Sequence, residues 1–189
     1  MAEKIKLTNE TVLMSLFAAF ICVGCFIQVP FLGGVPIVFQ DMLAIFAGLM
    51  LGPIYGVGAV IIFLCMGILG FPVFSGKAGL HVILQGVTGG FLIGYLFAAF
   101  TAGIFTKFFF KYSTCKTKEY IVLFLAVVTA TIIIFTCGVA GFMRVTHSGF
   151  VKTLTLVVVP FIPGTIIKVI LLVLLGRKFC PIIGNYISR

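Results

Sequence analysis

A lysine within an apolar segment is the side chain with the clearest chemical meaning in this chain. Lys168 ends the segment V-V-V-P-F-I-P-G-T-I-I-K, which begins at Val157 and is interrupted by Pro160, Pro163 and Gly164. Proline removes a backbone donor and clashes with the preceding turn, so these residues predict a broken helix. A lysine at the centre of a membrane span costs about 2.5 to 3.5 kcal/mol and by default faces a cavity or a partner. We therefore expect Lys168 to be functional.

The charge of Lys168 needs a partner. The regular helix is expected to restart near Thr165, whose hydroxyl can cap its first free N–H groups, with Lys168 one turn further on. Asp41 is the only acidic residue expected at membrane depth, so the counter-charge comes either from Asp41 or from outside the chain. We infer that an anionic ligand, most simply a carboxylate, ends at Lys168. The alternative is an ammonium that extends to the outer lipid headgroups.

A glycine-rich segment is the second feature that indicates a ligand site. The stretch G-F-P-V-F-S-G-K-A-G-L-H-V-I-L-Q-G-V-T-G-G-F, from Gly70 to Phe91, holds six glycines. Irregular backbone at membrane depth is tolerated only where it is buried in protein or lines a cavity, so we expect this segment to fold over or into a pocket. An ordinary outer loop is the alternative. The segment is no phosphate-binding loop, because its glycine spacing is wrong and Ala78 replaces the hydroxyl residue that holds magnesium.

Metal and redox chemistry have little support. His81 and His147 lie on different predicted outer segments, and no cluster of residues approaches the ligand count of a zinc site. The C-V-G-C sequence from Cys22 to Cys25 lies in an apolar stretch, where nothing stabilises a thiolate. We expect no cofactor and no metal.

The composition defines the elements that must position these residues. Of 189 residues, 62% are hydrophobic and 9% are charged, which excludes a water-soluble fold. A membrane-spanning helix takes about 20 apolar residues. We predict one all-α integral membrane domain, residues 1–189, with six transmembrane helices near 11–28, 37–51, 54–71, 86–106, 119–142 and 154–176. The glycine-rich segment is then an outer loop between the third and fourth spans.

The cations predict the orientation of the bundle. Most of the 13 Lys and Arg residues fall into three clusters: at the start, between the fourth and fifth spans, and at the end. Cytoplasmic loops are enriched in Lys and Arg, so we place both termini in the cytoplasm. These cations flank membrane segments and form no folded basic face, so nucleic-acid binding is not expected. We expect no signal peptide, because no small-residue cleavage site follows the basic start.

Several motifs together resemble the BioY family. They are G-V-P-I-V-F-Q (34–40), F-A-G-L-M-L-G-P-I-Y-G (46–56), G-F-P-V-F-S-G (70–76), G-V-T-G-G-F (86–91) and P-F-I-P-G (160–164), followed by Lys168. BioY proteins are the biotin-binding S components of energy-coupling factor (ECF) transporters. The resemblance implies a multi-pass protein of a prokaryotic cell membrane that captures a vitamin outside the cell. It implies a transporter subunit and not an enzyme.

The resemblance also implies partners. A transmembrane T subunit and two ATPase subunits would drive transport, and the T subunit would dock on small residues four apart on the first helix. The matching positions are Ser15 and Ala19, which permit close approach of another helix. A membrane enzyme or a channel is the remote alternative, because four acidic residues leave little from which to build a catalytic site.

The chain departs from the BioY pattern near the expected ligand. BioY sequences typically read P-G-D-x-x-K, and the acid belongs to the biotin site, whereas this chain has Thr165 at that position; Lys77, Leu80 and Val87 are further departures. Burying the two N–H donors of a ureido ring without acceptors costs about 1 to 3 kcal/mol each. Either Asp41 replaces the lost acceptor, or the ligand has no ureido ring. Lipoate meets the second condition, and we favour it, with biotin as the near-equal alternative.

The residues expected to bind the ligand come from both informative segments and from the start of the second span. Lys168, or Lys77, would hold the carboxylate. The full set is Lys168, Thr165, Gln40, Asp41, Phe74, Gly76, Lys77, Leu80, His81, Gln85, Thr88, Gly89 and Phe91.

Overall fold

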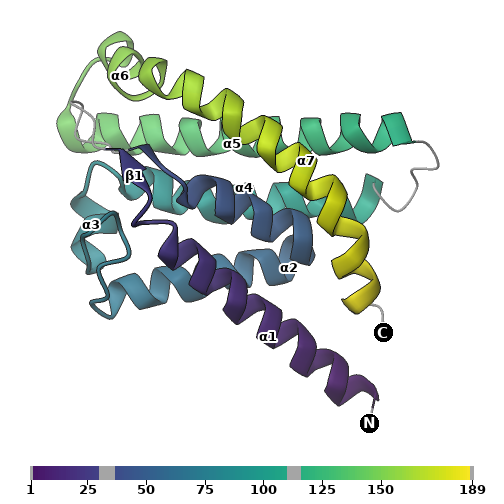
Figure 1. The fold of residues 1–189 in the computed structure, drawn as a ribbon. Coiled ribbons are helices and arrows are strands. Elements are labelled where there is room, and N and C mark those ends of the chain that lie inside the picture. Colours follow the sequence, from purple (N-terminus) through teal and green to yellow (C-terminus); the bar gives the residue numbers. More distant parts are fainter. Residues whose placement is uncertain (1, 30–36, 110–115, 188–189) are drawn as a thin grey trace.

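The protein is a bundle of long helices, seen here in a computed structural model that describes residues 2–29, 37–109 and 116–187 (Figure 1). The long helices are α1 (Ala2–Val23), α2 (Gln40–Ile68), α4 (Gly89–Phe109), α5 (Lys116–Thr146) and α7 (Ile162–Ile187). Shorter helical elements are α3 (Leu80–Gln85), α6 (Phe150–Val157) and the 3-10 helix η2 (Val159–Phe161). Two-residue strands β1 (Gln28–Val29) and β2 (Ile37–Val38) pair antiparallel. The strands are too short for sequence periodicity to reveal them.

Long apolar helices make this a multi-pass membrane protein. Among the described residues, four segments are long and apolar enough to cross a bilayer: Gln40–Ile68, Gly89–Lys107, Glu119–Thr146 and Phe150–Phe179. A shorter apolar helix covers Glu10–Val23. Large hydrophobic side chains such as Ile54 and Phe124 are more than half exposed on the surface of the bundle, where a bilayer would cover them.

The helix α2 is a folded-back pair and not one straight rod. Gly52 has φ 79° and ψ −176°, and Pro53 follows it. A Cβ on Gly56 would lie 2.6 Å from the Cα of Gly48, although eight residues of continuous helix span about 12 Å. The chain therefore reverses at Gly52, and the predicted spans 37–51 and 54–71 correspond to the two halves of α2. This turn lies beside the end of α4, because a Cβ on Gly103 would meet the backbone of Pro53 at 2.3 Å.

The break before Lys168 lies earlier than the sequence predicts. Residues Val159–Phe161 form η2, and α7 then begins at Ile162. Thr165 lies within the first turns of α7, so the expected restart near Thr165 is wrong. The physical reason is that proline is well accommodated in the first turn of a helix, where its missing N–H has no partner in any case. Pro163 therefore belongs to the new helix and does not separate it from the old one.

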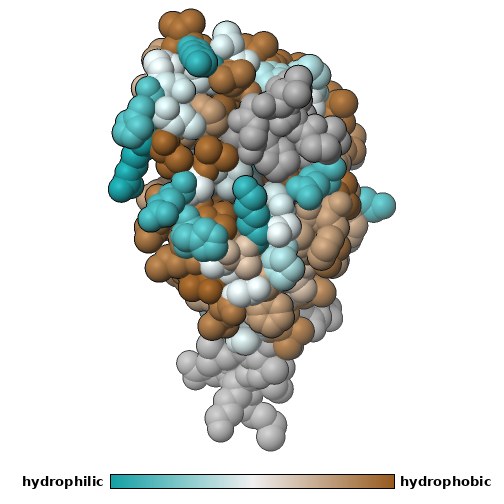
Figure 2. Space-filling model, turned by 90° about the vertical axis from the view of Figure 1, so that its left-hand side faces the viewer, coloured by the Kyte–Doolittle hydropathy of each residue, from teal (hydrophilic) through white to brown (hydrophobic). Residues whose placement is uncertain are grey.

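The two ends of the bundle differ in character. The start of α1, the end of α4, the start of α5 and the end of α7 lie at one end, and α3, α6 and the small sheet lie at the other (Figure 1). At the first end, Arg177 donates a hydrogen bond to the hydroxyl of Tyr120 and stacks over its ring. At the second end, hydrophilic side chains gather on the surface among hydrophobic ones (Figure 2). We call this second end the α3–α6 end.

Candidate functional site

An ion pair between a buried lysine and a partly exposed aspartate lies at the α3–α6 end. The side-chain nitrogen of Lys168, on α7, lies 2.8 Å and 2.9 Å from the two carboxylate oxygens of Asp41, in the first turn of α2. It also donates to the carbonyl oxygen of Val38, on β2, at 2.6 Å. Only 7% of Lys168 is exposed. A buried ammonium is costly unless it is paired and hydrogen-bonded, and here both conditions are met.

This pairing corrects the premise that an external anion must neutralise Lys168. Asp41 is the counter-ion, and an ammonium has only three N–H donors, which the two Asp41 oxygens and the Val38 carbonyl already occupy. The carboxylate keeps further lone pairs, because each of its oxygens can accept more than one hydrogen bond. The pair is therefore neutral in sum and offers acceptors, so a ligand carboxylate is not required at Lys168.

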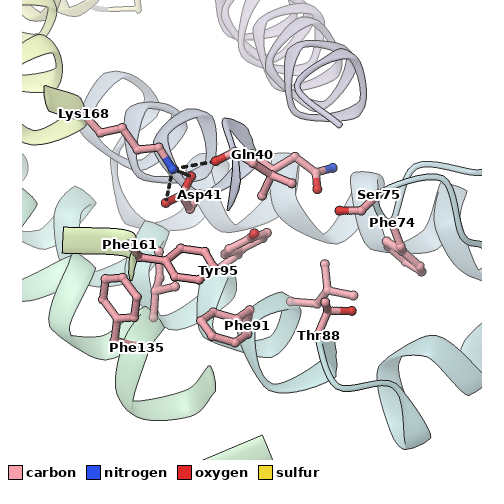
Figure 3. A pocket seen from close by; sticks show the side chains of 13 residues that line it. Gln40, Asp41, Phe74, Ser75, Thr88, Phe91, Tyr95, Phe135, Phe161 and Lys168 are labelled. Carbon is pink, nitrogen blue, oxygen red and sulfur yellow. Dashed lines mark hydrogen bonds and ion pairs between the residues drawn. The ribbon is translucent and has the colours of Figure 1, made fainter. Parts of the chain in front are cut away.

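A pocket lies beside the ion pair, and its empty volume of about 500 Å³ includes space that is open to solvent. Figure 3 shows side chains from α2, α4, α5, α7, η2 and the loop before α3 around one space. The lining residues are Val38, Gln40, Asp41, Phe74, Ser75, Thr88, Phe91, Leu92, Tyr95, Ile134, Phe135, Phe161 and Lys168.

Aromatic rings form much of the wall. The rings of Phe91 and Phe135 meet edge to face with centroids 6.3 Å apart, and those of Phe135 and Phe161 meet edge to face at 6.2 Å. Gly138 makes room for Phe91, because a Cβ there would lie 2.3 Å from the ring. Tyr95 lines the same wall and is 3% exposed. A mostly apolar wall with few polar groups is typical of a site that encloses an organic ring.

A tight turn places the loop before α3 over the pocket. Phe74 and Lys77 exchange two backbone hydrogen bonds of 3.0 Å. The two residues between them, Ser75 and Gly76, have φ of 51° and 81°, as in a type I′ turn, which needs positive φ at both central positions. Glycine adopts this conformation without strain. The turn carries Phe74 and Ser75 into the lining, while Lys77 is exposed.

The structure brings together some of the predicted site residues and leaves others outside. Those that line the pocket are Lys168, Gln40, Asp41, Phe74, Thr88 and Phe91. Among those outside it, Gly89 packs α4 against α3, since a Cβ there would lie 2.0 Å from a carbonyl oxygen. The other residues outside the lining are Thr165, Gly76, Lys77, Leu80, His81 and Gln85, of which Leu80, His81 and Gln85 are exposed on α3. Leu80, His81 and Gln85 lie on this short helix, which the glycine pattern does not predict.

Several lining residues carry no signal in the sequence. Tyr95, Ile134 and Phe135 lie in regular apolar helices and look like ordinary core positions. Phe161 lies in the broken segment before Lys168, and Ser75 lies in the glycine-rich loop, so both belong to segments that the sequence singles out. Only the packing of α4 against α5 shows which apolar side chains face the pocket.

Two other sequence features lie apart from the pocket. Ser15 and Ala19 are both exposed on α1, which leaves that face open to a partner helix. Cys25 is buried, and its thiol lies 3.7 Å from the carbonyl oxygen of Pro72. Within the described part of the chain, no group of His, Cys, Asp and Glu side chains is arranged to hold a metal ion.

The fold and the site define a membrane-embedded ligand-binding protein, and comparison with known proteins identifies its family. The sequence pattern of the BioY family matches residues 1–185. The chain is 33% identical to the "Biotin transporter BioY" of Rhizobium etli, over 90% of this chain and 92% of the relative. It is 33% identical to the protein of the same name from Rhodobacter capsulatus, over 89% and 92%. The chain belongs to the BioY family.

A solved structure supports the same assignment. The S component for biotin from an ECF-type ABC transporter superposes with a TM-score of 0.79 and 30% sequence identity, and the match covers 90% of each chain. The fold is therefore that of an ECF S component. The two relatives of this chain are named as transporters and not as enzymes.

Proposed function

We propose that this protein is the biotin-binding S component of an ECF-type transporter in a prokaryotic cell membrane. The observation that carries the proposal is the Lys168–Asp41 pair at the wall of a pocket in a BioY-family chain. The preference for lipoate, drawn from Thr165, is not supported. The relatives are named as biotin transporters. Thr165 has no carboxylate, but Asp41 provides one at the pocket.

The polar groups of the pocket suggest how biotin would lie. The ureido ring has two N–H donors and one carbonyl acceptor, so its donors need acceptors such as the free lone pairs of Asp41. The thiophane ring and the tail would then pack against Phe91, Phe135 and Tyr95. The valerate carboxylate would lie toward the hydroxyls of Ser75 and Thr88, which are at the opposite end of the pocket from Lys168 (Figure 3).

The orientation in the membrane and the partners belong to the same proposal. Lys107, Arg177 and Lys178 lie at the end of the bundle opposite the pocket, which places that end in the cytoplasm by the enrichment of cytoplasmic loops in basic residues. Both termini are then cytoplasmic, six helices cross the bilayer, and the pocket opens outward. A T subunit would dock on the face of α1 that carries Ser15 and Ala19, and two ATPases would supply the energy.

Ligand-dependent thermal stabilisation of the purified protein tests the proposal. A ligand at 100 times its Kd stabilises a protein by about 2.7 kcal/mol, so biotin at low concentration should raise the unfolding temperature and lipoate should not. Asp41→Asn should weaken the response to biotin, because one acceptor becomes a donor. Stabilisation by lipoate with no response to biotin would refute the assignment of the ligand. Mass spectrometry of the co-purified small molecule gives an independent answer.

A further inference from the structure

The amide of Gln40 is held at the pocket in one orientation. Gln40 is the first residue of α2 and is 1% exposed. Its nitrogen Nε2 donates to the carbonyl oxygen of Val73, in the loop before α3, at 2.7 Å, and to that of Ile21, on α1, at 3.3 Å. Both hydrogen bonds that its side chain makes with described residues are thus made by its nitrogen.

The Ile21 carbonyl accepts this bond because of the way α1 ends. The backbone N–H of Cys25, which would bond to Ile21 in a continuing helix, donates to the carbonyl of Cys22 at 3.3 Å. The carbonyls of a last helical turn need partners from outside the helix, and the Gln40 amide is one. Gln40 therefore ties α1, α2 and the loop that covers the pocket.

These two bonds decide which atom of the amide faces the ligand. A carbonyl oxygen can only accept, so an amide turned by 180° would set its own oxygen against two other oxygens. The nitrogen must therefore point toward Ile21 and Val73, and the oxygen is left for the pocket. Figure 3 shows the Gln40 oxygen directed into the space between α2 and α4.

We propose that Gln40 is a specificity-determining residue that presents a fixed acceptor to an N–H donor on the ring of the ligand. This inference rests on the proposed function, because it assigns one of the two ureido N–H groups to Gln40 and leaves the other for Asp41. A ring without N–H donors would cover the Gln40 oxygen without giving it a hydrogen-bond partner. The site therefore selects cyclic ureas over apolar rings that carry the same acidic tail.

A panel of ligands on the unaltered protein provides the first test. The probes are biotin, desthiobiotin, lipoate, and the two biotins methylated on one or the other ureido nitrogen. Loss of a buried hydrogen bond should make lipoate and at least one methylated biotin bind about ten- to hundredfold more weakly than biotin. Desthiobiotin keeps both N–H groups and should lose much less. Equal affinities of biotin and both methylated forms would overturn the inference, whereas no binding of biotin would refute the proposed function itself.

A pair of variants assigns the effect to Gln40. Gln40→Met removes the acceptor at nearly constant size, so the affinity ratio between biotin and the sensitive methylated form should approach unity. Ser75→Ala removes a hydroxyl from the same pocket and should leave that ratio unchanged. An unchanged ratio in folded Gln40→Met would overturn the inference.

A measurement on the native sequence covers the case in which Gln40→Met does not fold. Solid-state NMR can detect the dipolar coupling between ¹³C-labelled glutamine side chains and ¹⁵N-labelled biotin. The assignment is simple because the other glutamines in the sequence, Gln28 and Gln85, are exposed. We expect a close contact from one ureido nitrogen to a glutamine carboxamide carbon. Its absence in biotin-loaded protein would overturn the inference.

Discussion

Lys168 and Asp41 lie 127 positions apart in the chain, and the nitrogen of Lys168 approaches the two oxygens of Asp41 to 2.8 Å and 2.9 Å. The pair joins α7 to the start of α2 and borders the pocket, so it links two helices and shapes the site at once. BioY sequences typically carry the acid at the position of Thr165, one turn before the lysine on the same helix. Here the carboxylate reaches the lysine from another helix.

The ion pair should show strong energetic coupling. Removing one partner of a fully buried pair leaves an uncompensated charge and costs about 3 to 5 kcal/mol. The Asp41 side chain is 22% exposed, so Asp41→Asn and Lys168→Gln should each lower the free energy of unfolding by a smaller amount. The double variant removes both charges and should lose much less than the sum. Equilibrium unfolding of the four proteins in one detergent gives the coupling energy. Additive losses would show that the two side chains do not interact.

Close helix packing in α2 should make Gly48 intolerant of substitution. A Cβ on Gly48 would lie 2.2 Å from the backbone oxygen of Ala99, on α4. Overpacking costs about 1 to 3 kcal/mol, more than the gain of about 1 kcal/mol from alanine in a helix, so Gly48→Ala should lower the unfolding temperature. Gly149→Ala is the matched control, because no atom lies within 4 Å of a Cβ at that position. Equal stability of the two variants would contradict this packing.

Substitution at Gly138 should affect binding more than folding. A Cβ there would lie 2.3 Å from the end of the Phe91 ring, and a ring can move where backbone cannot. Gly138→Ala should push Phe91 into the pocket and weaken biotin binding, with a smaller loss of stability than Gly48→Ala. Calorimetric titration and thermal unfolding of the same preparations separate the two effects. Unchanged affinity would mean that the ring moves away from the pocket.

The proposed orientation predicts which positions are accessible from outside the cell. In a background without cysteine, Lys77→Cys and Lys152→Cys should react with a membrane-impermeant maleimide on intact cells. Lys107→Cys and Lys178→Cys should react only after the membrane is opened. All four side chains are exposed in the structure, so burial does not explain a difference. The reverse labelling pattern would show that the bundle has the opposite orientation in the membrane.

Much of the site could be anticipated from the sequence because unusual residues stand out against an apolar background. Polar and charged residues and irregular backbone are costly within a membrane, so their presence indicates a function. Here they are a lysine after a proline break, an acid beside a glutamine, and a run of glycines. These features locate Lys168, Asp41, Gln40 and Phe74 at the site. They do not locate Tyr95 or Phe135, whose types are the commonest choice for any buried helix.

The sequence by itself determined that the chain is a helical membrane protein, that a helix breaks between the spans 37–51 and 54–71 and another shortly before Lys168, and that this cation needs a partner. Composition and glycine or proline positions decide these points locally. Only the tertiary structure decided that Asp41 neutralises Lys168 and that Ile21 and Val73 hold the Gln40 amide in one orientation. Both arrangements depend on contacts between segments that are far apart in the chain. Local sequence does not encode the distance or the direction of such contacts.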